Sequence, residues 1–178
     1  MKLVAQAMRR ALAFLVATMV GISLLAGVRA GSQERIAMQT YDDLLLRVEE
    51  RVPGFGGMFI GPDGRLAVYL LDRSQIAAVR SAIESVFGAQ QVPAAGLLAL
   101  QAQYTVSQLK RWTERATELL AFSGVTMVDL DEAKNRVAVG LEDDSSTPIV
   151  EQALRRLSIP REAVLIQVTG PIRPLDTR

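Results

Sequence analysis

The side chains available for chemistry in this chain are carboxylates, hydroxyls, Tyr, Arg and a few lysines, because its 178 residues include neither His nor Cys. A Ser-His-Asp triad, a Cys-His pair and a zinc site built from His and Cys are therefore excluded. A Ser-Lys pair would need Lys110 or Lys134, and both fall on surfaces that the pattern predicts to be exposed. Neither Ser107 nor Ser123 lies in a Gly-x-Ser-x-Gly turn, so no serine nucleophile is indicated.

Three oxygen-bearing side chains, those of Asp129, Asp131 and Asn135, surround a predicted hairpin turn. Alternating oxygen ligands are typical of a calcium-binding loop. This segment lacks the central Gly and the distal Glu of an EF-hand loop, so a polar turn is the better interpretation. We expect no metal and no cofactor.

A run of three acids, Glu142, Asp143 and Asp144, comes before two serines and a threonine. Paired carboxylates can divide acid and base work between them, which would suit a carboxylate-based enzyme. Acids followed by hydroxyl residues are also what the first turn of a helix prefers, because they cap free N–H groups and complement the helix dipole. We interpret the run as a helix cap, and we expect the protein not to be an enzyme.

One stretch of the chain occurs twice. Residues 64–70 (Gly-Arg-Leu-Ala-Val-Tyr-Leu) are matched 71 positions later by residues 135–141 (Asn-Arg-Val-Ala-Val-Gly-Leu). The match continues without a gap, since Asp72 aligns with Asp143 and Val79 with Val150. The sequence therefore predicts one folding unit used twice.

Each unit is predicted to run helix, strand, strand, helix, strand, in an α+β fold. We place the first unit at residues 31–104, the second at 105–170 and an extended tail at 171–178. Alternating apolar residues and turn signals predict strands at 58–60, 66–70, 97–103, 125–130, 136–141 and 163–168. A strand-helix-strand connection crosses over right-handed and leaves its strands parallel, so each unit should be a small mixed sheet with its helices on one face.

The first 30 residues have the pattern of an export signal. Residues 1–10 carry three basic groups, residues 11–28 are apolar, and Val28-Arg29-Ala30 would allow cleavage before Gly31. A membrane anchor is the alternative, because 18 apolar residues can just span a bilayer. Either way we expect an exported protein, periplasmic or extracellular, or one anchored in the inner membrane. The remaining residues hold 16 basic and 19 acidic side chains, a balance that does not suggest nucleic-acid binding.

Several segments together resemble a known family. They are residues 129–131 with 135–141, the acidic cap and short helix that follow, and residues 159–164; residues 103–112 and 55–60 resemble segments of related exported bacterial proteins. The pattern is similar to the pro-region of secreted bacterial trypsin-like serine proteases of the alpha-lytic and streptogrisin type. The resemblance implies a module that assists the folding of a protease and then inhibits it. Residues 1–178 contain no protease domain, so we expect this role to be exerted on a separate chain.

The leading functional hypothesis is thus an exported protein-binding module without catalysis, whose partner could be a secreted serine protease. An extended strand edge or a Pro-rich tail would supply the contact. The residues expected to meet the partner are Ile166, Val168, Thr169, Ile172 and Leu175. The alternatives are an envelope-associated structural protein anchored through residues 11–28 and the carboxylate-based enzyme.

Overall fold

The computed structural model describes residues 40–171. The predicted export signal or anchor, the cleavage point before Gly31, and the tail residues Ile172 and Leu175 lie outside the described residues.

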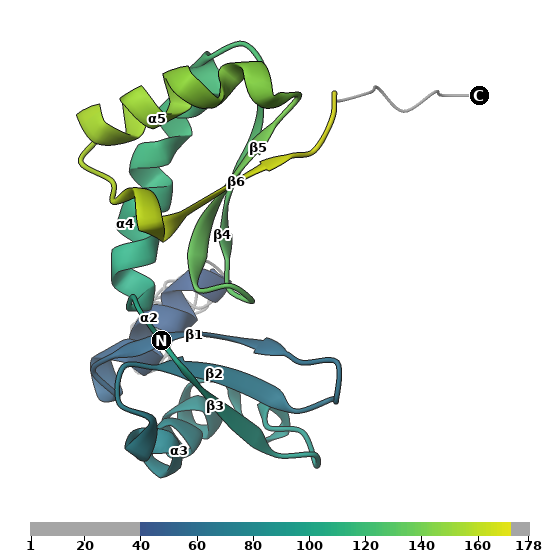
Figure 1. Ribbon diagram of the computed structural model, residues 1–178. Helices are drawn as coiled ribbons and strands as arrows, with labels where there is room; N and C mark the ends of the chain where they lie inside the picture. Colours follow the sequence, from purple (N-terminus) through teal and green to yellow (C-terminus); the bar gives the residue numbers. More distant parts are fainter. Residues whose placement is uncertain (1–39, 172–178) are drawn as a thin grey trace, which may run out of the picture. The chain divides into compact units, whose positions relative to one another are not determined.

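Two copies of the predicted unit follow one another, which confirms the α+β fold and the repeated order (Figure 1). The elements of the first copy are α2 (Tyr41–Arg51), β1 (Phe55–Ile60), β2 (Leu66–Leu70), α3 (Ile76–Phe87) and β3 (Leu97–Gln101). Those of the second copy are α4 (Val106–Ala116), β4 (Val125–Asp131), β5 (Arg136–Leu141), α5 (Thr147–Arg156) and β6 (Val164–Val168). Both copies belong to a single compact unit that begins at Asp42.

Each copy forms a three-stranded mixed sheet with its middle strand second in sequence. In the first sheet β2 pairs antiparallel with β1 and parallel with β3, and in the second β5 pairs in the same way with β4 and β6. Leu66 lies opposite Leu97 in the first parallel pair, and Val137 lies opposite Val164 in the second. The repeat in the sequence is therefore a repeat in strand register as well.

Strand β1 begins at Phe55, three residues before the predicted strand. The register with β2 shifts between Phe55 and Met58, so Gly56 and Gly57 lie in a β-bulge, which the alternating pattern does not reveal. The second copy has the same irregularity between Val125 and Met127.

The acidic run caps a short 3-10 turn (Asp144–Ser146) ahead of α5, as interpreted from the sequence. The carboxylate of Asp143 accepts a 2.8 Å hydrogen bond from Ser145 N, and Asp72 accepts one of 3.0 Å from Ser74 N at the equivalent place in the first copy. Hydrogen bonds from these serines lower the pKa of both aspartates. One aspartate thus has the same structural use, as a cap, in each copy.

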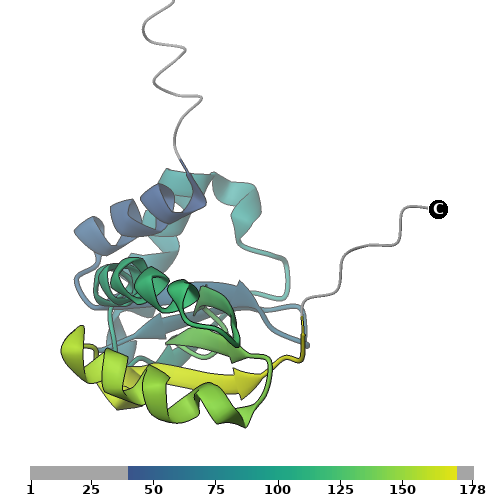
Figure 2. The same ribbon diagram turned by 90° about the horizontal axis from the view of Figure 1, so that it is seen from above.

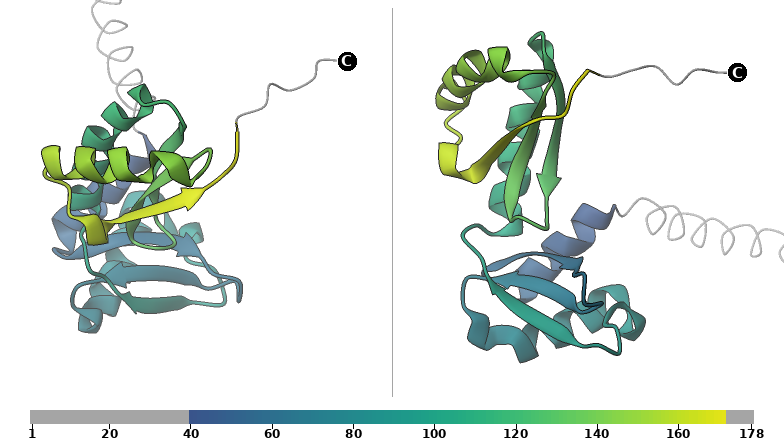
Figure 3. Two further views of the ribbon diagram at one scale, coloured as in Figure 1. Left: turned by 45° about the horizontal axis from the view of Figure 1, so that its top comes forward. Right: turned by 45° about the vertical axis from the view of Figure 1, so that its right-hand side comes forward.

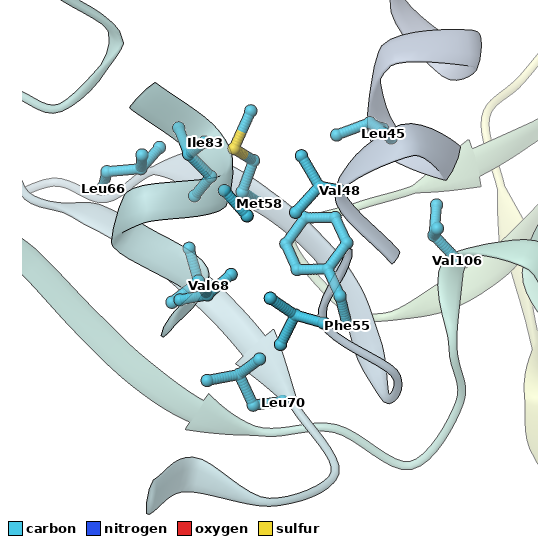
Figure 4. Close-up of a cluster of buried hydrophobic side chains, with 12 residues drawn as sticks. Leu45, Val48, Phe55, Met58, Leu66, Val68, Leu70, Ile83 and Val106 are labelled. Carbon is cyan, nitrogen blue, oxygen red and sulfur yellow. The ribbon is translucent and has the colours of Figure 1, made fainter. Parts of the chain in front are cut away.

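The hydrophobic residues form two cores, one on a single face of each sheet. In the first, Leu45 and Val48 of α2 and Ile83 of α3 point toward Phe55 and the apolar side chains of β2 (Figure 4). In the second, α4 and α5 pack on their sheet in the same manner (Figure 3). This confirms that the helices cover one face of each sheet.

Candidate functional site

Strand β6 is one of the two edge strands of the second sheet (Figure 2). Thr169 N donates a 2.8 Å hydrogen bond to Leu141 O, which continues the parallel ladder to β5. In a parallel ladder, alternate residues direct both backbone groups to the same neighbouring strand. Counting back from Thr169, the N–H and C=O groups of Val164, Ile166 and Val168 point away from β5.

Strand β6 itself contains no charge, proline or bulge that would block a further strand. Natural edge strands are commonly blocked by charges, prolines or bulges, whereas β6 reads Val-Leu-Ile-Gln-Val. Among residues 40–171, the one group that covers an outward carbonyl of β6 is the Arg161 guanidinium, whose Nη1 donates to Val164 O at 2.8 Å. Val168 is 54% exposed. The outward backbone groups of Ile166 and Val168 are therefore the open part of this edge.

The predicted contact residues divide into three kinds. The side chain of Ile166 packs against the second core, so only its backbone faces outward. The Val168 side chain is exposed. The Thr169 hydroxyl is 2.7 Å from that of Thr126 and donates to Leu141 O at 3.2 Å. Thr169 thus fixes the end of β6 to the sheet, and its hydroxyl already has hydrogen-bond partners within the protein.

A glycine in the middle strand leaves room for the hydrogen bond between Thr126 and Thr169. Gly140 occupies the position of Tyr69 in the first copy. A Cβ on Gly140 would lie 2.4 Å from Met127 Cγ and 2.8 Å from Thr126 Oγ1. The missing side chain gives Thr126 room to reach Thr169 across β5 and so supports the open edge.

Strand β3 is the equivalent edge of the first sheet and is less open. Its first four residues are half-buried, and the exposed Gln101 turns its side chain back to Leu71 O at 3.0 Å. The two edges share their backbone geometry, so β3 supplies an internal comparison for β6.

Asn135, one of the three candidate calcium ligands, is 1% exposed and joins the two copies. Its Oδ1 accepts hydrogen bonds from Gln103 N (2.9 Å) and Tyr104 N (3.0 Å) in the linker between the copies. Its Nδ2 donates to Gly56 O of β1 and to Tyr104 O, both at 2.9 Å. All four bonds are structural, and residues 40–171 contain no cluster of three acidic side chains arranged to hold a metal ion.

The sequence predicts part of this junction between the copies. Asn135 stands where the first copy has Gly64, and both have positive φ angles, 54° and 76°. Asn and Gly are the residues that most readily adopt this conformation, so the turn itself is predictable. The inward direction of the amide is not, because its partners lie 31, 32 and 79 residues away.

Two of the hydroxyl and lysine candidates, Ser107 and Lys110, contact helix α2. Glu49 of α2 accepts hydrogen bonds from Ser107 N (2.7 Å) and Ser107 Oγ (2.8 Å) at the start of α4. Lys110 lies 3.1 Å from a carboxylate oxygen of Asp42 and 3.3 Å from one of Glu114. The hydrogen bond to Asp42 raises the pKa of Lys110, the opposite of what a lysine base requires.

Glu132 is half-buried in the turn between β4 and β5, beside the carbonyl of Ala133 that accepts a 2.9 Å bond from the Tyr69 hydroxyl. Burial raises the pKa of Glu132, and the negative charges of Asp129, Asp42 and Asp131 raise it further. A carboxyl whose pKa is higher in the folded state opposes folding when ionised, and this opposition disappears as the pH falls through the raised value.

Replacing Glu132 by Gln should therefore stabilise the protein at pH 7, with a Tm increase of about 2 °C. The difference between variant and parent should shrink as the solution is acidified, because the parent carboxyl then becomes neutral too. Thermal unfolding followed by circular dichroism between pH 7 and pH 4 measures both effects. A variant that is less stable than the parent at pH 7 would contradict the assignment.

The chain matches no protein-family model and no curated protein. None of the helices between residues 40 and 171 is long and apolar enough to cross a membrane. The backbone geometry and the composition of β6 therefore make it the candidate binding site.

Proposed function

We propose that this chain is an exported protein-binding module of the protease pro-region type, which has no catalytic activity and binds its partner by strand addition at β6. The observation that carries the proposal is the edge itself: Ile166 and Val168 direct N–H and C=O groups outward from an uncharged strand, and these groups have no hydrogen-bond partner among residues 40–171. Such an edge is a template for an added strand.

In strand addition, affinity and specificity come from different groups. Main-chain hydrogen bonds supply affinity, and pockets for alternate side chains supply specificity. A strand laid beside β6 would place every second side chain on the helix-covered face, next to the partly buried Ile166. Its other side chains would lie on the opposite face, beside the exposed Gln167. An extended segment with an apolar residue at every second position fits this edge.

Replacing Val168 by Pro should abolish binding while the fold is kept. Proline removes one N–H group, and at Val168 that group points away from β5, so no hydrogen bond of the sheet is lost. The probe is a displayed library of random ten-residue peptides selected on the full chain. The parent should enrich apolar, extended sequences, and V168P should not enrich them.

Ala99→Pro is the matched control, because it removes an outward N–H from the equivalent edge strand β3. It should leave the selected peptides bound. Loss of binding in A99P with retention in V168P would move the site to β3. Equal enrichment by the parent and by both variants would refute strand addition.

The proposed type of partner is a secreted trypsin-like serine protease, and the support is the resemblance to protease pro-regions of residues 129–131 and 135–141, the acidic cap and short helix that follow, and residues 159–164. A streptogrisin-type protease should be inhibited by the full chain, and its refolding yield should rise when the chain is present. V168P should lose both effects. A protease that merely digests the chain would show inhibition that fades as the chain is cleaved, and no gain in refolding.

Export rests on the charged and apolar pattern of residues 1–30. When the chain is expressed in a bacterium, amino-terminal sequencing of the exported fraction should give Gly31 as the first residue. Recovery of uncleaved chain from the membrane fraction would favour the anchored, envelope-associated alternative.

A further inference from the structure

The amino-terminal end of strand β6 is closed by a single residue, Arg161. Its guanidinium Nη1 donates a 2.8 Å hydrogen bond to Val164 O, and its backbone carbonyl accepts a hydrogen bond from Val164 N. Both of these Val164 groups point away from β5, toward the place where an added strand would lie. Arg161 therefore occupies both backbone groups through which a partner strand would pair with Val164.

A second contact fixes the direction of the Arg161 side chain. Its Nε donates to Glu151 Oε1 on helix α5 at 3.0 Å, and the two side chains are 52% and 39% exposed. An exposed ion pair of this kind contributes little to stability by itself. Together with the bond to Val164 O, however, it holds the guanidinium at two points beside the edge of the sheet, at the surface that a partner would approach.

The fold does not require an arginine at this place. Leu97 is the first residue of β3, as Val164 is of β6, and both strands pair in parallel with the repeated middle strand. The residue three positions before Leu97 is Ala94, whose side chain has no group that donates to a carbonyl. The first copy thus completes the same strand connection without a guanidinium beside its edge.

The carboxyl-terminal end of the β6 edge is bounded by the backbone itself. Gly170 has a φ angle of 77°, which lies outside the extended range of a strand. The next residue is Pro171, which has no N–H to donate. The open part of the edge therefore runs only from Ile166 to Val168, and two residues within it direct backbone groups outward.

We infer that Arg161 determines which strands β6 accepts, by limiting an added strand to pairing with Ile166 and Val168. A longer strand would have to displace the guanidinium from Val164 O, and would exchange one hydrogen bond for another. The partner therefore needs no backbone N–H where it faces Val164, and the edge fits a short extended segment that tolerates a proline or a turn at that position. This inference rests on the proposed strand addition at β6.

The test is an ester scan of one proline-free, ten-residue peptide selected on the full chain, with its enriched positions at the centre. Each ester replaces one backbone N–H of the peptide by oxygen, which removes a donor and adds no bulk. Binding of the fluorescein-labelled peptides is followed by fluorescence polarisation. In the parent, esters should weaken binding about fivefold at two positions, those that donate to Ile166 O and Val168 O. The two positions should lie two residues apart, and the next position of that series, which faces Val164, should be insensitive.

Arg161→Ala gives β6 the residue that the first copy has at this place. It frees Val164 O, so the third position should become sensitive, and the unmodified peptide should bind about fivefold more tightly than to the parent. A purely stabilising role for Arg161 would not change the pattern of sensitive positions. Arg156→Ala is the matched control, because it removes an exposed arginine of the same copy whose carboxylate neighbour is Glu118. It should keep the parent pattern.

Three sensitive positions in the parent would overturn the inference and leave strand addition intact, and so would an R161A variant that keeps the two positions of the parent. A parent that enriches no peptide, or a scan without a sensitive position, would refute strand addition itself and this inference with it. Circular dichroism melting shows whether R161A is folded, and the scan of the parent decides between the outcomes if it is not.

Discussion

Replacing Asn135 by Ala should lower the free energy of unfolding by about 3–5 kcal/mol, the largest effect expected of any single substitution considered for this protein. The change removes four hydrogen bonds and leaves the backbone groups of Gly56, Gln103 and Tyr104 without these partners. Unpaired polar groups in a buried site cost more than the bonds themselves gain. Urea denaturation followed by tryptophan fluorescence gives the value, since Trp112 packs edge-on against Tyr104, with ring centroids 5.0 Å apart.

Asn135→Gly separates the hydrogen bonds from the backbone conformation. Glycine tolerates the positive φ angle at this position, as Gly64 does in the first copy. If the amide network provides the stability, N135G should lose most of what N135A loses. Retention of parental stability in N135G would show that the alanine variant suffers only from backbone strain.

Replacing Gly56 by Ala should destabilise the protein by about 2 kcal/mol, because the added methyl group enters a closely packed site. Its Cβ would lie 2.6 Å from Tyr104 O, 2.8 Å from Asn135 Nδ2 and 3.0 Å from the Cβ of Ala102. Two of these neighbours belong to the backbone or the short side chain of the linker, so they have little freedom to move aside. The linker or the Asn135 amide must shift in the variant.

Chemical denaturation of G56A, N135G and the double variant tests the coupling. The double variant should lose less than the sum of the single losses, because both changes disturb the same contact. Gly61→Ala is the matched control, since the nearest atom to its Cβ is an exposed carboxylate oxygen of Asp63 at 3.1 Å, and no atom of the linker lies within 4 Å. Strict additivity would show that Gly56 is needed for the β-bulge alone.

The repeat, the strand order and the helix caps were predictable from the sequence because each has a local signal. The 71-residue offset aligned Asp72 with Asp143, and both prove to cap a helical turn in the same way. The start of β1 was misplaced because two consecutive glycines read as a loop, whereas the bulge places them within the strand.

The contacts made by the candidate residues were harder to predict from the sequence, since they depend on segments far apart in the chain. The oxygens around Asn135 suggested a metal ligand or a polar turn, and neither interpretation indicates that the amide points inward to Gly56. At β6, the alternation of apolar residues predicts a strand but does not say which backbone groups face outward. That assignment needs the register with β5, which comes from the fold of the whole second copy.

The junction at Asn135 also sets a limit on how many such units can be joined in series. In the first copy, the Asn135 amide contacts Gly56. Phe55 pairs with Leu70, and Val125 pairs with the equivalent residue, Leu141. The residue of the second copy that corresponds to Gly56 is therefore Thr126. Thr126 carries a side chain engaged by Thr169 at the place where the amide would have to approach. A further unit, or a neighbouring molecule, could not dock on the second copy as the second docks on the first. The contact is therefore not self-propagating, and it protects the protein from the open-ended head-to-tail polymers that repeated interfaces otherwise build.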